Sequence, residues 1–157
     1  MNDYIIETQD LNFSYSKSFK DIEKLNLQVP KGSIYGFLGP NGSGKTTTIR
    51  LLLGLLKKES GAITLFGNSF NKDRIESLSK IGALIENPSL YGHLSGKDNL
   101  KIAARYRSVD PDRIEEVLEI VNLLHVKSKK VKKYSLGMKQ RLGLAIALLS
   151  KPEILIL

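Results

Sequence analysis

The feature that most constrains this chain is a glycine-rich run with the pattern G-x-x-x-x-G-K-T, from Gly39 to Thr46. Glycines in such a run let the backbone turn its N–H groups inward around phosphate oxygens, which side chains would obstruct. Lys45 brings a positive charge to the outer phosphates, and the hydroxyl of Thr46 is placed to ligate Mg²⁺. The residues predicted to bind phosphate are Gly39, Pro40, Asn41, Gly42, Ser43, Gly44, Lys45, Thr46 and Thr47.

The segments on either side of this run predict a strand, a turn and a helix in that order. Ser33 to Leu38 is a compact apolar run ended by glycine, which is typical of a buried strand. After Thr46, apolar residues recur with the spacing of a helix that buries one face. These residues are Ile49, Leu52, Leu53 and Leu56. The order predicts an α/β fold around a phosphate-binding loop.

The rest of the chain divides into a β-rich beginning and a helical middle. Alternating or β-rich segments predict strands at Tyr4–Thr8, Asn12–Tyr15, Lys24–Val29 and Ala62–Phe66, and an apolar run predicts another from Ile154 to Leu157. Asp110 before Pro111 predicts a helix start, followed by buried Ile114, Val117, Leu118 and Val121. A further helix is expected from Ser135, with Leu142, Ala145, Ile146 and Leu149 inward.

Composition narrows the class of protein. The 157 residues contain no cysteine, which excludes a disulfide scaffold and a thiolate zinc site. The longest apolar runs fall far short of the roughly 18 residues that cross a bilayer, and the acidic first ten residues are unlike a signal peptide. We therefore expect a cytoplasmic protein. Five of the seven residues from Lys127 to Lys133 are lysines within a net charge of +8, and this run is interpreted as a solvated loop.

A second motif distinguishes among the many proteins that bind phosphate in this way. Residues 134–142, YSLGMKQRL, resemble the signature segment of ABC ATPases, and the resemblance covers essentially the whole chain. It implies that Ser135, Leu136, Gly137 and Met138 bind the nucleotide held by a second protomer. A helix that starts at Ser135 would by itself offer an anion site of open N–H groups. Leu136 and Met138 depart from the usual LSGGQ pattern and resemble the exporter and ABC-2 subtypes.

Two further positions take their expected roles from this resemblance. Tyr15 matches the aromatic residue that stacks on the adenine ring in ABC ATPases. Glu86 stands where that family usually has a glutamine that contacts Mg²⁺ and the attacking water. This glutamate, together with the segment ENPSLYGHL, resembles the ATPase subunits of bacitracin and lantibiotic export or self-immunity transporters. Thr46 and Glu86 are therefore the expected metal ligands, whereas His93 and His125 have no partner at ligand spacing.

The resemblance implies a P-loop NTPase fold of the ABC nucleotide-binding type, incomplete, with an antiparallel β subdomain and a helical subdomain. The expected divisions are 1–86 for the β subdomain and P-loop core, 87–135 for the helical subdomain, and 136–157 for a truncated return to the core. Implied cofactors are ATP and Mg²⁺. Implied partners are a second nucleotide-binding domain and transmembrane permease subunits, without nucleic acid, on the inner face of the cell membrane.

The leading functional prediction is an ATP-binding motor subunit of a transporter that exports peptide antibiotics or similar amphiphiles. Two alternatives stay open: a non-catalytic nucleotide-binding fragment, and a soluble ABC ATPase that acts on nucleic acid. In the family, the Walker B aspartate and its adjacent glutamate follow the strand that here ends at Leu157. Phosphoryl transfer needs such a carboxylate, so no complete catalytic set is expected and this chain alone is predicted to have negligible ATPase activity.

Overall fold

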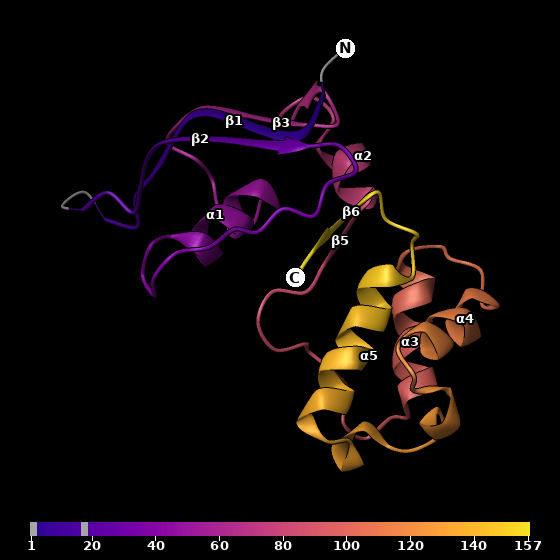
Figure 1. The fold of residues 1–157 in the computed structure, drawn as a ribbon. Helices are drawn as coiled ribbons and strands as arrows, with labels where there is room; N and C mark the ends of the chain where they lie inside the picture. Colours follow the sequence, from indigo (N-terminus) through magenta and orange to yellow (C-terminus); the bar gives the residue numbers. More distant parts are fainter. Residues whose placement is uncertain (1–2, 17–18) are drawn as a thin grey trace. The chain divides into compact units, whose positions relative to one another are not determined.

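A computed structural model describes residues 3–16 and 19–157 of the chain. It contains two compact units, Met1–Leu78 and Ser79–Leu157, which are described separately below. The first unit contains a sheet and the helix that follows the glycine-rich loop, with most of a second short helix at its end, and the second unit is mainly helical (Figure 1).

The sheet of the first unit is antiparallel, with the strand order β2-β1-β3-β4. Its strands are β1 (Tyr4–Phe13), β2 (Ile22–Pro30), β3 (Ser60–Leu65) and the short β4 (Asn68–Ser69). Helix α1 spans Lys45–Leu52, and α2 spans Arg74–Ser79. Alternate residues of β1 are buried, including Ile6, Leu11 and Phe13, which gives the sheet one apolar face.

The first predicted strand pair, Tyr4–Thr8 and Asn12–Tyr15, is one continuous strand that contains a bulge. The backbone of Asp10 has a φ of 44° there, and the register with β2 shifts between Thr8 and Leu11. Thr8 is only 3% exposed, and its hydroxyl oxygen accepts from Leu27 N and donates to Leu25 O, both at 2.9 Å. The threonine thus satisfies backbone groups that the irregular ladder leaves unpaired.

Helix α1 is shorter than the sequence predicts. It ends at Leu52, and Gly54 follows in the left-handed region with a φ of 65°. Leu56 therefore lies beyond the helix. The buried residues of the helix are Thr48, Leu51 and Leu52. Leu51 therefore lies on the inward face, although the spacing did not predict it there.

The strand predicted for Ser33–Leu38 is wrong. In the described residues no strand pairs with this segment, and its backbone has no regular structure. Ile34 and Leu38 are 105% and 91% exposed. An apolar run becomes a strand only where neighbouring backbone pairs with it, and the pattern alone carries no information about that neighbour. The glycine-rich loop is therefore followed by its predicted helix but is not preceded by its predicted strand.

The second unit joins a two-stranded parallel sheet to a helical bundle. β5 (Ile81–Ala83) pairs with β6 (Ile154–Ile156), which confirms the predicted C-terminal strand and adds one that the sequence patterns did not indicate. The helices are α3 (Gly96–Tyr106), α4 (Arg113–Ile120) and α5 (Leu136–Leu148), with 3₁₀ turns η1 (Leu124–Val126) and η2 (Val131–Lys133). Their common core includes Leu100, Ile114, Val117, Leu118, Val121, Leu123, Val131, Leu142, Ala145 and Leu149.

Side-chain caps fix two of these helix starts. Ser95 accepts from Asp98 N at 3.1 Å before α3, and Ser135 accepts from Met138 N at 3.3 Å before α5, as the sequence predicts for Ser135. Asp110 does not cap α4, because the capping position belongs to Asp112. The carboxylate of Asp110 instead accepts from Asp112 N at 2.9 Å in the preceding turn.

Among the described helices, none has the length and apolar character that a membrane crossing requires.

Candidate functional site

At two positions the backbone of the glycine-rich loop has a conformation that favours glycine. Gly42 and Gly44 have φ values of 82° and 85°, in the left-handed region. A Cβ atom added to Gly44 would lie 2.5 Å from Ile22 Cδ1, and one added to Gly39 would lie 2.6 Å from Ser43 Oγ. The loop therefore curls tightly over the start of α1 because its glycines lack side chains.

The N-terminus of α1 is open toward this loop. Its capping residue is Gly44, and within the described chain no side chain accepts a hydrogen bond from the first turn, which also contains no acidic residue. The first N–H groups of a helix have no partner inside the helix, and they carry about half a positive charge in sum. Backbone N–H groups of Lys45, Thr46 and Thr47 are therefore donors for an external anion.

The side chain of Lys45 folds back across the loop. Its Nζ donates to the carbonyl oxygens of Gly39 at 2.6 Å and Pro40 at 2.7 Å. An ammonium group has three donors, so one remains for a further acceptor. These two hydrogen bonds hold the ammonium group beside the glycine-rich loop, which also lies at the open N–H groups of α1. This arrangement fits a phosphate group.

The first unit also places Tyr15 beyond the end of β1. Its side chain is 57% exposed, and its ring meets that of Phe13 edge to face at a centroid distance of 4.8 Å. The backbone N–H of Tyr15 donates to Asp21 Oδ2 at 2.8 Å. The sequence motifs indicate Tyr15 but not Asp21, because this carboxylate lies directly before β2 and no motif marks it.

In the second unit, the predicted signature residues form the exposed start of α5. Leu136 is 71% exposed, and a Cβ atom added to Gly137 would meet nothing within 4 Å. Ser135 caps the helix through its hydroxyl. The backbone at Gly137 is therefore accessible to a ligand or a partner, as an anion site in contact with a second molecule requires.

Glu86 has a strained backbone beside the same helix. Its φ of 63° is rare for a residue with a side chain. It lines a hollow together with Leu84, Gln140, Arg141, Leu144 and Leu157. Gln140 Nε2 donates to Asn87 Oδ1 at 3.2 Å, which ties the loop of Glu86 to α5. The structure thus brings Glu86 to the helix that the signature residues begin.

Among the described residues, neither unit contains a ready-made metal cluster. In the described residues, no three His, Cys, Asp or Glu side chains are grouped closely enough to hold an ion. The hydroxyl of Thr46 and the carboxylate of Glu86 are the expected ligands, and they lie in different units. A hard cation that arrives with phosphate oxygens needs few protein ligands, so the hydroxyl of Thr46 beside the glycine-rich loop fits Mg²⁺ of that kind.

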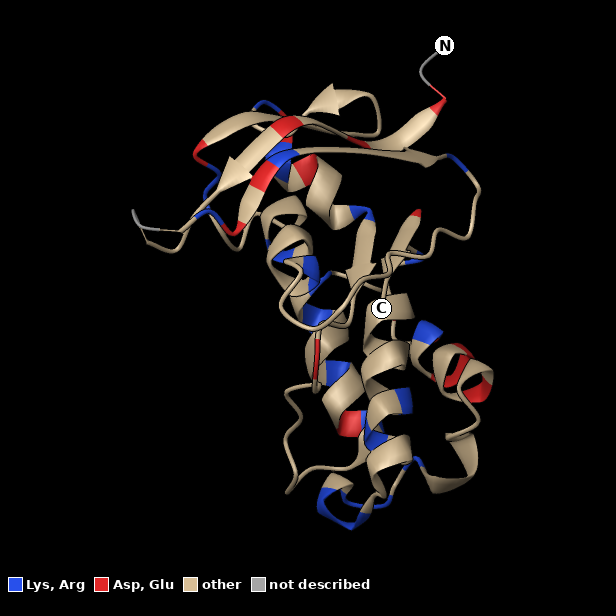
Figure 2. Cartoon of the chain, turned by 60° about the vertical axis from the view of Figure 1, so that its left-hand side comes forward, with Lys and Arg blue, Asp and Glu red and all other residues tan. Residues whose placement is uncertain are grey.

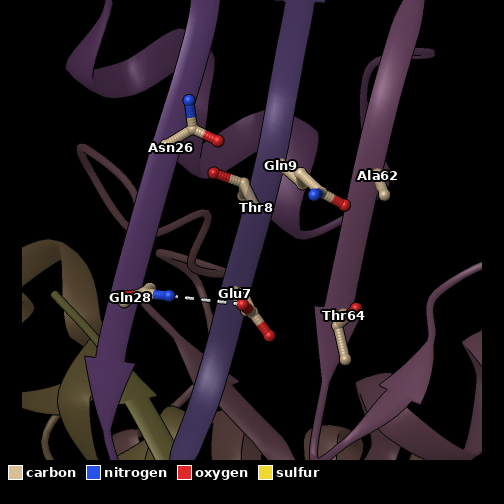
Figure 3. Close-up of a pocket in the computed structure, with 7 residues that line it drawn as sticks. All are labelled: Glu7, Thr8, Gln9, Asn26, Gln28, Ala62 and Thr64. Atoms are coloured by element: carbon tan, nitrogen blue, oxygen red, sulfur yellow. Dashed lines mark hydrogen bonds between the residues drawn. The ribbon is translucent and has the colours of Figure 1, made fainter.

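A polar hollow on the sheet was not predicted from the sequence. It is lined by Glu7, Thr8, Gln9, Asn26, Gln28, Ala62 and Thr64, and Gln28 donates to Glu7 at 3.3 Å (Figure 3). Its lining holds a carboxylate and no Lys or Arg, so it lacks the charge that phosphate binding requires. The glycine-rich loop remains the better phosphate site.

Comparison with known proteins places the chain in a class. The family model described as ABC transporter matches residues 22–157. The bacitracin transport ATP-binding protein BcrA of Bacillus licheniformis is 53% identical over 154 residues, which cover 98% of this chain and 50% of that protein. The lantibiotic transport ATP-binding protein SrtF of Streptococcus pyogenes is 40% identical over 153 residues, covering 98% and 65% of the two chains.

A solved structure agrees with this placement. The chain of cbiO1 from Clostridium perfringens, part of the ABC transporter complex cbiONQ, superposes with a TM-score of 0.85 at 26% identity, covering 98% of this chain and 65% of that one. The chain therefore belongs to the ABC transporter family. It has part of the ABC ATPase fold, and the relatives named above are ATP-binding proteins of bacitracin and lantibiotic transport. The predicted fold class is confirmed, and the chain spans about half the length of the BcrA proteins it matches.

Proposed function

We propose that this chain binds the triphosphate of ATP at residues 39–47 and forms the nucleotide-binding part of an ATP-driven export subunit. One observation carries the proposal: the start of α1 has no cap of its own and lies under a glycine-rich curl beside the Lys45 ammonium. Open N–H groups and a fixed cation in one place are a phosphate site.

Each residue of the loop has a separate task in this proposal. The N–H groups of the first turn of α1 donate to phosphate oxygens. Lys45 Nζ donates to an outer phosphate oxygen through a charge-assisted bond, which is about twice as strong as a neutral one. The Thr46 hydroxyl holds Mg²⁺, and the Tyr15 ring, which is half-exposed, stacks on the adenine.

Glu86 is proposed as a second oxygen ligand on the metal and as a group that orients the attacking water. A carboxylate offers Mg²⁺ a charged oxygen where an amide would offer a neutral one. When bound, Mg²⁺ would supply positive charge that neutralises the phosphate oxygens. In this proposal the carboxylate of Glu86 accepts a hydrogen bond from the attacking water.

The start of α5 is proposed as the contact with a second nucleotide-binding domain. Ser135, Leu136, Gly137 and Met138 would face the outer phosphate held by the other domain, so that ATP joins two domains. The exposed Leu136 and the open surface at Gly137 support this assignment. A helix start of thirteen helical residues offers open N–H groups and a favourable dipole to that phosphate.

The cargo is proposed from the names of the relatives. Two BcrA proteins, 53% and 46% identical to this chain, are named for bacitracin transport, and SrtF is named for lantibiotic transport. We infer that the protein works with transmembrane permease subunits at the inner face of the cell membrane and exports peptide antibiotics or similar amphiphiles.

Titration calorimetry with Mg²⁺ATP tests the binding site. Lys45→Ala removes a charge-assisted bond worth about 1.5–3 kcal/mol and should weaken binding roughly 10- to 100-fold. Lys31→Ala removes an exposed lysine from the turn before the loop and serves as the control. Equal affinities for the wild type and Lys45→Ala would contradict the site.

The cargo is tested separately in cells that produce the transporter. We expect wild-type cells to survive higher bacitracin or lantibiotic concentrations than cells with Lys45→Ala, whereas Lys31→Ala should match the wild type. Equal sensitivity of all three strains would overturn the proposed cargo and leave the nucleotide site intact.

A further inference from the structure

The lysine run before α5 is a fixed structure with its charges on the outside. Lys129, Lys130, Lys132 and Lys133 are exposed, whereas Val131 between them is 1% exposed. Figure 2 shows the run as blue segments along the loop that leads into α5. Val131 is buried while the lysines on both sides of it are exposed, so four exposed lysines lie within one five-residue segment.

Backbone hydrogen bonds hold this run against the loop before α3. Lys132 N donates to Gly92 O at 2.8 Å, and Val131 N donates to Leu94 O at 2.9 Å. The isolated bridge between Ser95 and Lys130 continues the same pairing. Two segments far apart in the sequence are hydrogen-bonded to each other, and this pairing fixes the backbone that carries the lysines.

Side-chain hydrogen bonds and an ion pair also hold the lysine run in place. Tyr134 is 5% exposed, and its hydroxyl donates to Val126 O at 3.0 Å. Lys127, the first lysine of the run, pairs with Glu115 of α4 at 2.7 Å, and Lys97 pairs with the same carboxylate at 2.9 Å. The run is therefore fixed at its first lysine, in its middle and at its end.

No described acidic residue neutralises the remaining four lysines. Within residues 3–16 and 19–157, neither Lys129 nor Lys130 has an acidic partner, and the same is true of Lys132 and Lys133. Four like charges held close together repel one another, and that cost is relieved when opposite charge binds. The surface is thus complementary to an acidic ligand.

The facing loop adds an exposed tyrosine to this surface. Tyr91 is 50% exposed and precedes Gly92, the acceptor of the bond from Lys132. Asn99, which is 3% exposed, accepts from Tyr91 N at 2.8 Å and donates to Tyr91 O at 3.1 Å. The buried amide holds the tyrosine backbone in place, directly before the glycine that accepts the bond from Lys132. We call Tyr91, Lys129, Lys130, Lys132 and Lys133 the lysine platform.

We propose that the lysine platform docks an acidic segment of a partner protein, with carboxylates on the lysines and an apolar side chain on Tyr91. Tyrosine is common at protein interfaces because it offers a large, stiff surface with a polar tip. Complementary charge around it raises the association rate and excludes partners of the wrong sign.

The chemistry of the platform favours a peptide over the two other polyanions. Nucleic-acid sites rely on arginine for bidentate contacts and neutralise many phosphates, whereas this surface offers four lysines and no arginine. Lipid-binding lysine clusters adjoin a membrane helix or lie on an amphipathic helix, whereas these lysines lie on and beside a 3₁₀ turn. An acidic peptide needs only a few fixed charges and an aromatic neighbour.

The docking proposal goes beyond the proposed nucleotide function. It can be wrong while the nucleotide proposal remains correct. All platform residues lie in the second unit, and the glycine-rich loop lies in the first. A variant that loses peptide docking should therefore keep its affinity for Mg²⁺ATP, and Lys45→Ala should keep peptide docking.

Fluorescence anisotropy with a labelled twelve-residue peptide of alternating glutamate and leucine tests the proposal on the full-length chain. The platform variant replaces Lys129, Lys130, Lys132 and Lys133 by glutamine. The control variant replaces Lys24, Lys31, Lys57 and Lys72, which are exposed elsewhere, by glutamine. Both variants lower the formal net charge by the same amount, from +8 to 8 − 4 = +4.

We expect the platform variant to bind the peptide at least tenfold more weakly than the wild type and the control variant to bind within twofold. Tyr91→Ala should weaken binding several-fold without changing its salt dependence, because it removes no charge. Equal losses in both lysine variants would overturn the proposal, since any cationic surface would then suffice. Tighter binding to phosphatidylserine vesicles or to duplex DNA than to the peptide would overturn it as well.

Discussion

Asp21 holds the backbone of Tyr15: Asp21 Oδ2 accepts from Tyr15 N at 2.8 Å. Asp21 is itself bonded to the strand before the tyrosine, because its N–H donates to Phe13 O at 3.1 Å. The next residue, Ile22, reaches the glycine-rich loop, where a Cβ atom on Gly44 would lie 2.5 Å from Ile22 Cδ1. Two adjacent residues therefore connect the proposed adenine contact to the proposed phosphate contact.

This connection predicts that Asp21 positions Tyr15 for the base and does little for the phosphates. Asp21→Ala should weaken ATP binding about 3- to 10-fold, a part of the ~1–3 kcal/mol that an aromatic ring contributes by stacking on a base. It should leave the affinity for inorganic tripolyphosphate unchanged. Calorimetric titration with both ligands measures the difference.

Asp21→Asn is the matched variant, because its amide oxygen still accepts from Tyr15 N. We expect it to restore most of the ATP affinity. A loss of tripolyphosphate affinity equal to the loss of ATP affinity would show that Asp21 acts through the glycine-rich loop, contrary to the prediction.

The two glycines of α5 should respond in opposite ways to alanine. A Cβ atom on Gly143 would lie 2.7 Å from Pro88 Cβ and 3.0 Å from Leu84 Cδ1, whereas one on Gly137 meets nothing within 4 Å. Gly143→Ala should destabilise the protein by about 1–3 kcal/mol through overpacking. Gly137→Ala should stabilise it by roughly 0.5–1 kcal/mol, because alanine loses less entropy than glycine in a helix.

Urea denaturation followed by circular dichroism measures both changes. Similar effects of the two substitutions would contradict the close packing of α5 on the loop from Leu84 to Pro88. Because Gly137 also lies in the proposed contact with a second domain, its stability is measured on the protein without nucleotide.

Local residue types predicted two helix starts correctly. Helix α1 begins at Lys45 directly after the glycine-rich run, and Ser135 caps α5, both as predicted. The segment Ser33–Leu38 has the composition of a strand but no neighbour in the described chain. Strand formation depends on a partner elsewhere, and a single segment contains no record of it.

Other features could not be read from the sequence because they arise only after distant segments meet. The role of Asp21 depends on the hydrogen bonds between β1 and β2, and the parallel pair of β5 with β6 joins residues more than seventy positions apart. The lysine run, interpreted as a solvated loop, is bonded to Gly92 and Leu94. Charge composition alone does not distinguish a free solvated loop from a loop whose backbone is hydrogen-bonded to another segment.

The hydroxyl of Thr8 predicts a test of the bulge in the sheet. Thr8→Val keeps the shape but leaves Leu27 N without its acceptor at a buried position. The cost should be about 1–3 kcal/mol. Thr8→Ser keeps the hydroxyl and should recover part of that loss in urea denaturation. Equal stabilities of wild type and Thr8→Val would show that the hydroxyl is dispensable.

The carboxylate of Glu115 predicts a pH dependence for the helical unit. The hydrogen bond from Lys127 and then that from Lys97 lower the pKa of Glu115 from 4.5 to about 2. A carboxyl with a lowered pKa in the folded state stabilises fully above its unfolded pKa and loses that contribution as pH falls through the folded pKa. The contribution of Glu115 should therefore be complete above about pH 4.5 and fade toward pH 2.

Glu115→Gln should lower the melting temperature at pH 7, and the gap to the wild type should narrow between pH 4.5 and 2. Because this carboxylate is exposed at the surface, 0.5 M salt should also narrow the gap by screening its two lysines. Glu119→Gln removes an exposed acid of the same helix that pairs with no lysine or arginine in the described residues, and its gap should stay small throughout. A gap for Glu115→Gln that is constant from pH 7 to 2 would mean that the two lysines do not stabilise the fold through this carboxylate.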